Sequence, residues 1–122
     1  MIEAFFDTGI VVDALQNEPR AGVELQRTSR PWISRISWIE IMASAPETAL
    51  AETEAFLRLF AISELDEEIA RRAALMRQQR PSLSSPHAII WASAQVSGRI
   101  LVTRNIKDFP SEMPGIRIPY TL

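Results

Sequence analysis

The sequence predicts a single α/β domain in which a parallel sheet of about five short strands is covered by helices on both faces. Short apolar runs alternate with stretches whose apolar residues recur at helical spacing, and this alternation is typical of strand–helix–strand units. The 122 residues contain no internal repeat and no linker-like stretch, so one domain spanning 1–122 is expected. With 47% hydrophobic residues and no cysteine, the chain can bury a core but has neither disulfides nor thiolate metal sites.

Two strands and three helices are expected in the first third of the chain. The first strand ends in the apolar pair Phe5-Phe6, directly before Asp7, and Pro31 precedes the second strand. Ser37 is expected to open the third helix as its cap. The expected elements are, in order, a strand at about 2–6, a helix at 8–15, a short helix ending near 27, a strand at 32–36 and a helix at 37–45.

The remainder of the chain continues the alternation. Ser84-Ser85-Pro86 has the pattern of a helix start, with serine as cap and proline in the first turn. That helix, which ends at Gly98, is apolar on nearly every side and is therefore expected to be central and buried. The expected elements are an apolar helical stripe at 49–60, a strand around Ile62, a helix after Asp66, a helix from 86 to 98, and strands at 99–103 and 116–118.

Polar side chains follow several of these strands. Asp7, Glu40 and Asp108 each come soon after an expected strand, and His87 lies in the first turn of the buried helix. In open α/β sheets, binding sites form beyond the carboxyl ends of the strands. The four side chains are therefore expected to converge at one edge of the sheet.

Each acidic residue has a structural alternative. Asp7 could bind a hard cation such as Mg²⁺, or it could cap the helix that begins at Thr8. Ser37 and Glu40 have the spacing of a capping box, in which the glutamate reaches back to the helix start, and this spacing alone favours the box. Asn105 could cap a turn that contains Asp108 in the same way.

His87 is the only histidine of the chain. A lone histidine is more often structural than a metal ligand. However, the positive end of a helix dipole disfavours protonation, and neutral imidazole is the form that binds metal. Imidazole is a softer ligand than carboxylate, so His87 in a metal site would favour Mn²⁺ over Mg²⁺.

Five segments taken together resemble PIN-domain nucleases, and in particular toxins of the VapC type from type II toxin–antitoxin systems. They occur in the family's order and at its spacing, and they cover essentially the whole chain. The segments are residues 7–12, which begin Asp7-Thr8-Gly9; residues 37–43, around Glu40; residues 86–94, which begin Pro86-His87; residues 101–109, which end Lys107-Asp108-Phe109; and residues 114–118.

The resemblance implies a PIN-like three-layer α/β/α sandwich and a carboxylate site that binds Mg²⁺ or Mn²⁺ and hydrolyses RNA. Carried over position by position, it implies catalytic roles for Asp7, Glu40 and Asp108, and a metal site made by these three with His87. The supporting residues that it implies beside them are Thr8, Thr103 and Asn105.

Two positions depart from the family pattern. Gly9 stands where asparagine is usual, and His87 stands where a metal-binding aspartate is expected, which removes one negative charge from the site. Two functions therefore remain open: a metal-dependent endoribonuclease toxin, or a catalytically silent PIN module that binds antitoxin or RNA. A third candidate, a nucleotide-binding or receiver-like domain, would need a glycine-rich phosphate loop after the first strand, where only Gly9 lies.

The partners follow from charge and from the resemblance. The formal net charge is −2, so RNA would have to meet a local basic rim. Candidates near the expected strand ends are Arg30, Arg35, Arg104 and Lys107. The resemblance implies a small VapB-like antitoxin, a homodimer, and a heterotetramer or larger assembly with the antitoxin. The chain shows no leader pattern and no apolar run of about 20 residues, so a cytoplasmic protein without membrane contact is expected.

Overall fold

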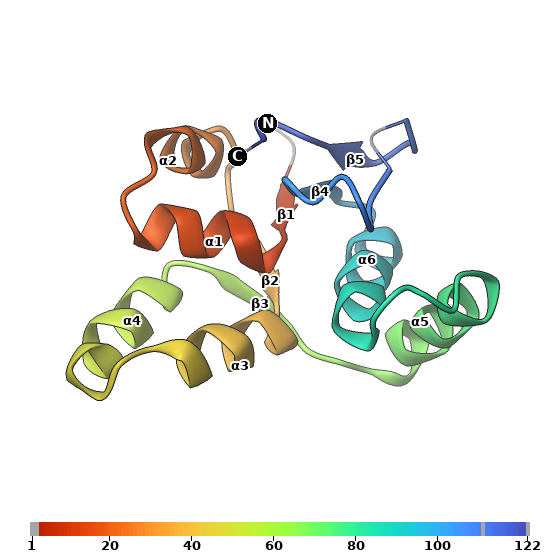
Figure 1. Cartoon of the computed structure of the whole chain (residues 1–122), viewed down its shortest axis with the longest axis horizontal. Coiled ribbons are helices and arrows are strands. Elements are labelled where there is room, and N and C mark those ends of the chain that lie inside the picture. Colours follow the sequence, from red (N-terminus) through yellow and green to blue (C-terminus); the bar gives the residue numbers. More distant parts are fainter. Residues whose placement is uncertain (1–2, 111, 122) are drawn as a thin grey trace.

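A parallel sheet of five short strands forms the centre of the structure, a computed structural model that describes residues 3–110 and 112–121 (Figure 1). The strand order is β3-β2-β1-β4-β5, and every neighbouring pair is parallel. The strands are β1 (Ala4–Phe6), β2 (Trp32–Ser34), β3 (Ala61–Ser63), β4 (Ile100–Val102) and β5 (Ile116–Arg117).

Neighbouring residues of the central strands supply the two faces of the sheet. Phe5 is paired with Leu101 and packs in one hydrophobic cluster, whereas Phe6 is paired with Val102 and packs in the other. Successive side chains of a strand point to opposite faces, so two adjacent apolar residues serve both. A strand buried on both faces therefore carries an unbroken apolar run, as the sequence shows at Phe5-Phe6.

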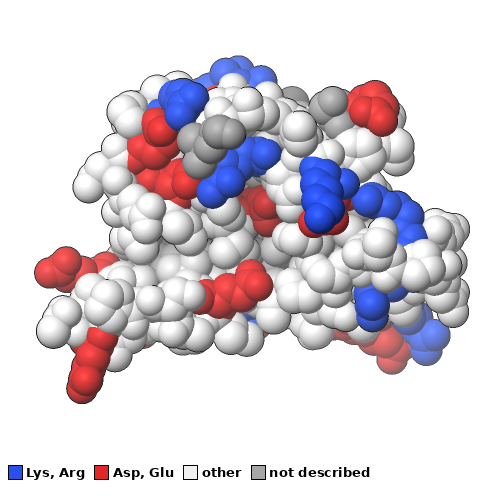
Figure 2. All heavy atoms as spheres, in the orientation of Figure 1, with Lys and Arg blue, Asp and Glu red and all other residues white. Residues whose placement is uncertain are grey.

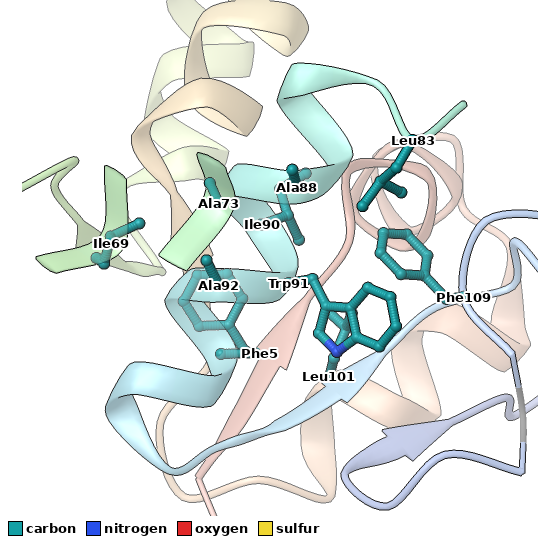
Figure 3. Packing of buried hydrophobic residues seen from close by; sticks show 11 residues of the cluster. Phe5, Ile69, Ala73, Leu83, Ala88, Ile90, Trp91, Ala92, Leu101 and Phe109 are labelled. Atoms are coloured by element: carbon teal, nitrogen blue, oxygen red, sulfur yellow. The ribbon is translucent and has the colours of Figure 1, made fainter. Parts of the chain in front are cut away.

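Helices α5 (Glu67–Gln79) and α6 (Ser85–Ser97) cover one face of the sheet. Figure 3 shows Phe5 and Leu101 on the strands, with residues of α5 and α6 and the loop residue Phe109 around them. Six residues of α6 are buried, which confirms the central position expected from its apolar composition. Trp91 is among them, and its ring contacts Phe109 edge to face at 5.5 Å.

Four helices cover the opposite face, and with the sheet they complete a three-layer α/β/α sandwich (Figure 1). This confirms the expected fold class. The four helices are α1 (Thr8–Leu15), α2 (Pro19–Gln26), α3 (Arg35–Ser44) and α4 (Leu50–Leu57), the last preceded by a short 3₁₀ turn, η1 (Glu47–Ala49).

The start of α3 differs from the expectation. The strand ends at Ser34, and the helix begins at Arg35, because the Ser34 side chain accepts a hydrogen bond from Ile36 N at 3.1 Å and caps the helix. Ser37 is therefore inside the helix, and the capping box predicted for Ser37 and Glu40 is wrong. Its failure leaves the Glu40 side chain available for another role.

Other helix ends follow the sequence pattern. Asp66 caps α5 by accepting a hydrogen bond from Ile69 N at 2.9 Å. Ser84 caps α6, and Gly98 ends it in the left-handed region at φ 68°, a conformation that glycine adopts without steric cost. Within residues 3–110 and 112–121, no helix is both long and apolar enough to cross a membrane.

Candidate functional site

A cleft of about 490 Å³ opens at the carboxyl edge of the sheet, where β1 ends and α1 begins. Figure 2 shows acidic side chains near the centre of this face, with basic side chains close by. The residues that line the cleft are Asp7, Thr8, Gly9, Val12, Glu40, Ile41, Ser44, His87, Arg104, Asn105, Ile106 and Lys107.

Asp7 is the most buried acid of the cleft, with 4% of its surface exposed. One carboxylate oxygen accepts a hydrogen bond from Thr8 N at 2.9 Å, and the other accepts from Thr103 Oγ1 at 2.8 Å. Asp7 thus caps α1 and also lines the cleft, so both predicted roles coexist. Burial raises the pKa of Asp7 above its ordinary value; the Thr103 hydrogen bond and the neighbouring His87 side chain only partly oppose this effect.

Glu40 reaches the cleft through a hydroxyl pair. Thr8 Oγ1 donates to Glu40 Oε1 at 2.9 Å, and it lies 2.8 Å from Ser37 Oγ. Ser37 is fully buried, so this contact fixes the Thr8 hydroxyl between α1 and α3. The nearby Glu40 charge also contributes to the raised pKa of Asp7, which places the two carboxylates within electrostatic reach of each other.

His87 and Asp108 form a pair at one side of the cleft. His87 Nδ1 lies 3.1 Å from Asp108 Oδ2 and 3.0 Å from Ser84 Oγ. The imidazole also meets the ring of Phe109 edge to face, with centroids 5.3 Å apart. Asp108 Oδ2 additionally accepts a hydrogen bond from Asn105 Nδ2 at 3.0 Å.

Asn105 organises the loop that carries Asp108. Its side-chain oxygen accepts hydrogen bonds from Lys107 N and Asp108 N, both at 3.2 Å, as expected for a capping asparagine. Asn105 lines the cleft but Asp108 does not, because the Asp108 carboxylate is turned toward Asn105 and His87.

Two of the four basic residues predicted from the sequence to bind RNA line the cleft. Arg104 and Lys107 are both cleft residues. Arg35 is engaged by Glu64, with Nε to Oε1 at 3.0 Å. Arg30 precedes β2 and therefore lies at the amino edge of the parallel sheet, opposite the cleft, where it stacks on Trp32.

A divalent cation such as Mg²⁺ needs several oxygen ligands close together. Within residues 3–110 and 112–121, no three acidic, histidine or cysteine side chains form a group that could hold a metal ion. The four-residue metal site is therefore not preassembled. The buried carboxylate of Asp7 and the nearby Glu40 do fit a hard cation, since Mg²⁺ keeps several waters and commonly uses one or two carboxylates together with substrate phosphate.

Three residues that contact side chains of the cleft are not predicted from the sequence as site residues. Asp13 holds Arg104 in the cleft, Ser37 contacts Thr8, and Ser84 contacts the His87 ring. The sequence pattern indicates only helix caps at Ser37 and Ser84. Asp13 carries a detectable signal, because an acid in the apolar stretch of residues 10–15 calls for a buried partner.

The chain is similar to known proteins over nearly its whole length. The family model of the PIN domain matches residues 4–111. Ribonuclease VapC19 of Mycobacterium tuberculosis is 33% identical over 122 residues, which covers 93% of this chain and 97% of the relative. A chain of a toxin–antitoxin complex from Klebsiella pneumoniae superimposes with a TM-score of 0.89 at 36% identity, over 98% of this chain and 99% of that chain. A chain of the DNA-bound VapBC of Salmonella typhimurium superimposes with a TM-score of 0.80 at 26% identity, over 96% of each chain.

Proposed function

This chain belongs to the PIN-domain family, and from that membership we propose that it is a VapC-type, metal-dependent endoribonuclease toxin that hydrolyses RNA phosphodiester bonds. The observation that carries the proposal is the buried Asp7 carboxylate, whose pKa is raised by burial, at a cleft shared with Glu40 and two cations. Desolvated, like-charged carboxylates favour a divalent cation as their counter-charge.

The proposed division of labour follows the contacts. Asp7, oriented by Thr103 and by the start of α1, is the first metal-binding residue, and Glu40, oriented by Thr8, is the second. A bound Mg²⁺ or Mn²⁺ would supply an acidified water and would offset charge on the attacked phosphate. Asp108 orients His87, so the two enter the site as a pair.

A catalytically silent module that binds antitoxin or RNA is the second candidate. The observation that favours it is the pairing of His87 with Asp108, because the imidazole occupies the carboxylate that the family pattern assigns to metal. Both candidate functions involve the same fold and binding of an antitoxin. They differ only in whether the cleft hydrolyses RNA.

An apolar groove supports the antitoxin part of the proposal. A depression of about 320 Å³ lies between α1, α3 and the start of α4, and it shares Val12, Ile41 and Ser44 with the cleft. A peptide segment could lie on the groove and continue into the acidic cleft, where an arginine would complement Asp7 and Glu40. We also propose a homodimer, a heterotetramer or larger assembly with the antitoxin, and a cytoplasmic location, where RNA and antitoxin are available.

The deciding experiment is cleavage of a mixed pool of structured RNAs by antitoxin-free protein, with Mn²⁺, with Mg²⁺ or with a chelator. Cutting is expected with metal, is expected to stop with the chelator, and is expected to fall by more than about 100-fold in Asp7→Ala. A well-folded wild-type protein that cuts nothing with either metal would contradict the nuclease and favour the silent module.

His87→Asp separates the two candidates further. In an active nuclease the introduced carboxylate is expected to tighten Mg²⁺ binding about tenfold, because affinity rises with ligand charge. Without metal it is expected to lower the melting temperature, since the new charge faces Asp108. If His87→Asp instead converts an inactive protein into an active one, the natural residue is the cause of silence.

A further inference from the structure

We propose that Arg104 is the phosphate-binding residue of the cleft, and that Asp13 and Tyr120 hold it in position. The phosphate is identified as part of an RNA strand, which rests on the function proposed above. The three residues come from α1, from the loop after β4 and from the C-terminal segment, so only the folded chain brings them together.

Arg104 is fixed by a two-point ion pair. Its Nε donates to Asp13 Oδ2 at 2.7 Å, and its Nη2 donates to Asp13 Oδ1 at 3.3 Å. Such a fork-to-carboxylate contact fixes the plane of the guanidinium group as well as its position. The Arg104 side chain remains 32% exposed while that of Asp13 is 8% exposed, so the acid is buried behind a cation that faces the cleft.

The C-terminal segment also contacts the Asp13 carboxylate. Tyr120 Oη donates to Asp13 Oδ2 at 2.8 Å, so this oxygen accepts from both the tyrosine and Arg104. Burial, together with the hydrogen bond to Asp13, raises the pKa of Tyr120 well above its usual range and keeps the phenol protonated as a donor. Arg20 stacks on the tyrosine ring, with its guanidinium carbon 4.7 Å from the ring centroid.

Gly9 keeps one face of the guanidinium group uncovered. A Cβ built at Gly9 would lie 3.5 Å from both Cζ and Nη2 of Arg104, which is ordinary van der Waals contact. A larger side chain at this position would extend over the group or displace it. The glycine that departs from the family pattern therefore leaves this part of the guanidinium group free of a side chain from position 9.

The donors and the surrounding charge suit a phosphodiester. Guanidinium has five N–H donors, and Asp13 engages only Nε and Nη2; within the described residues, Arg104 Nη1 makes no hydrogen bond. Asp7 lies within electrostatic reach of Arg104. A phosphate held by Nη1 would thus be placed beside the acidic residues that RNA would otherwise avoid.

The alternative is that Arg104 is only a strut, that is, a structural link that connects α1, the loop after β4 and the C-terminal segment without contacting RNA. Both roles predict a lower melting temperature when Arg104 is truncated. Only the phosphate-binding role predicts a change in the salt dependence of RNA binding, because each phosphate neutralised by a cation releases counterions.

The test measures binding of a fluorescein-labelled single-stranded RNA of mixed sequence by anisotropy, with a chelator present and over a series of salt concentrations. Arg104→Gln is expected to weaken binding several-fold and to reduce the slope of log affinity against log salt by about 0.7, one single-strand phosphate. Arg104→Lys is expected to keep the wild-type slope. The matched control is Arg71→Ala, which removes an arginine from the exposed Glu67 ion pair of α5 and is expected to leave the slope unchanged.

Positioning by the C-terminal segment is tested separately with Tyr120→Phe. This change leaves the charge of Arg104 intact, so the RNA affinity and the salt slope are expected to stay at wild-type values. The cleavage rate kcat is expected to fall several-fold, with KM unchanged, because Arg104 no longer holds the phosphate in one geometry. An unchanged kcat would overturn the role of Tyr120.

The outcomes separate this proposal from the nuclease itself. If wild-type protein does not cut RNA but Arg104→Gln reduces the slope of log affinity against log salt, Arg104 binds phosphate in a silent module. If wild-type protein cuts and the folded Arg104→Gln variant keeps the wild-type slope, Arg104 is only a strut. A wild-type protein that fails to bind RNA even at low salt would also overturn the phosphate-binding role.

Discussion

The two edges of the sheet carry similar residue types but arrange them differently. At the amino edge, Arg99 Nη2 lies 2.9 Å from Glu3 Oε1, and Trp32 Nε1 donates to the same oxygen at 3.2 Å. Arg99 and Arg30 also stack on the Trp32 ring, with centroid distances of 3.9 and 4.9 Å. At the carboxyl edge, Asp7 is almost completely buried, and the charged groups surround an open cleft.

The difference lies in how the charges are balanced. Glu3 at the amino edge has a lowered pKa, chiefly because Arg99 donates a hydrogen bond to it. Asp7 at the carboxyl edge has a raised pKa, because burial outweighs its hydrogen bonds. A stabilised, paired carboxylate is structural, whereas a destabilised, desolvated one in a cleft marks a site that can bind a counter-charge. Charge at a strand end is therefore not sufficient to identify a site.

The largest expected change in unfolding free energy comes from truncating the aromatic residue that packs next to the carboxyl edge of the sheet, compared with the one at the amino edge. Phe109 is fully buried and meets both His87 and Trp91, whereas Trp32 is only partly buried. Phe109→Ala is expected to cost about 3–5 kcal/mol of unfolding free energy. Trp32→Ala should cost clearly less, as measured by urea denaturation of both variants. Equal losses would mean that the amino edge is as firmly packed as the cleft.

The next effect compares matched carboxylates. Glu40→Gln at the cleft is expected to lower RNA cleavage by about 10–100-fold, because it weakens the proposed metal site. Glu3→Gln at the amino edge is expected to leave cleavage unchanged and to shift only the melting temperature. Single-turnover cleavage of both variants checks this, and a loss in Glu3→Gln would contradict a purely structural amino edge.

A smaller effect is expected in stability. Since the folded-state pKa of Asp7 is raised above its ordinary 3.8, the ionised carboxylate costs stability at neutral pH. This cost appears as the pH rises through the ordinary value toward the raised one, and it is absent below the ordinary value. Asp7→Asn is therefore expected to stabilise the metal-free protein at pH 7 by on the order of 1 kcal/mol. The gain should vanish in strong acid when melting is followed against pH, and a gain independent of pH would contradict this cause.

The smallest effect belongs to the amino-edge cations. Arg99→Ala removes the stack on Trp32 together with the partly exposed ion pair to Glu3, and the two losses are together expected to cost about 0.5–1 kcal/mol. RNA binding should not change, because this edge lies opposite the cleft. Thermal melting and RNA anisotropy check the two parts, and weaker RNA binding in Arg99→Ala would show that the amino edge also contacts RNA.

The sequence predicted most of the fold because local signals dominate it. The strand–helix alternation, the cap at Ser84 and the helix end at Gly98 are each encoded within a few residues and appear as expected. The predicted start of α3 was wrong because Ser34 and Ser37 are both plausible caps. Which serine caps the helix depends on where β2 stops pairing with β3. That choice decided whether Glu40 belongs to a cap or to the cleft.

The order of elements follows from the sequence alone, as do the apolar strands that serve both faces and the positions of the polar residues after them. These features are encoded locally because hydrophobic periodicity and capping are short-range properties of the chain. Which charged side chains are paired depends instead on contacts between distant parts of the folded chain. Arg104 meets Asp13 across 91 residues and Tyr120 meets it across 107, while Arg30 lies at the opposite edge from Arg104. Such pairings depend on burial and on the direction of each strand, which a chain acquires only when the sheet is assembled.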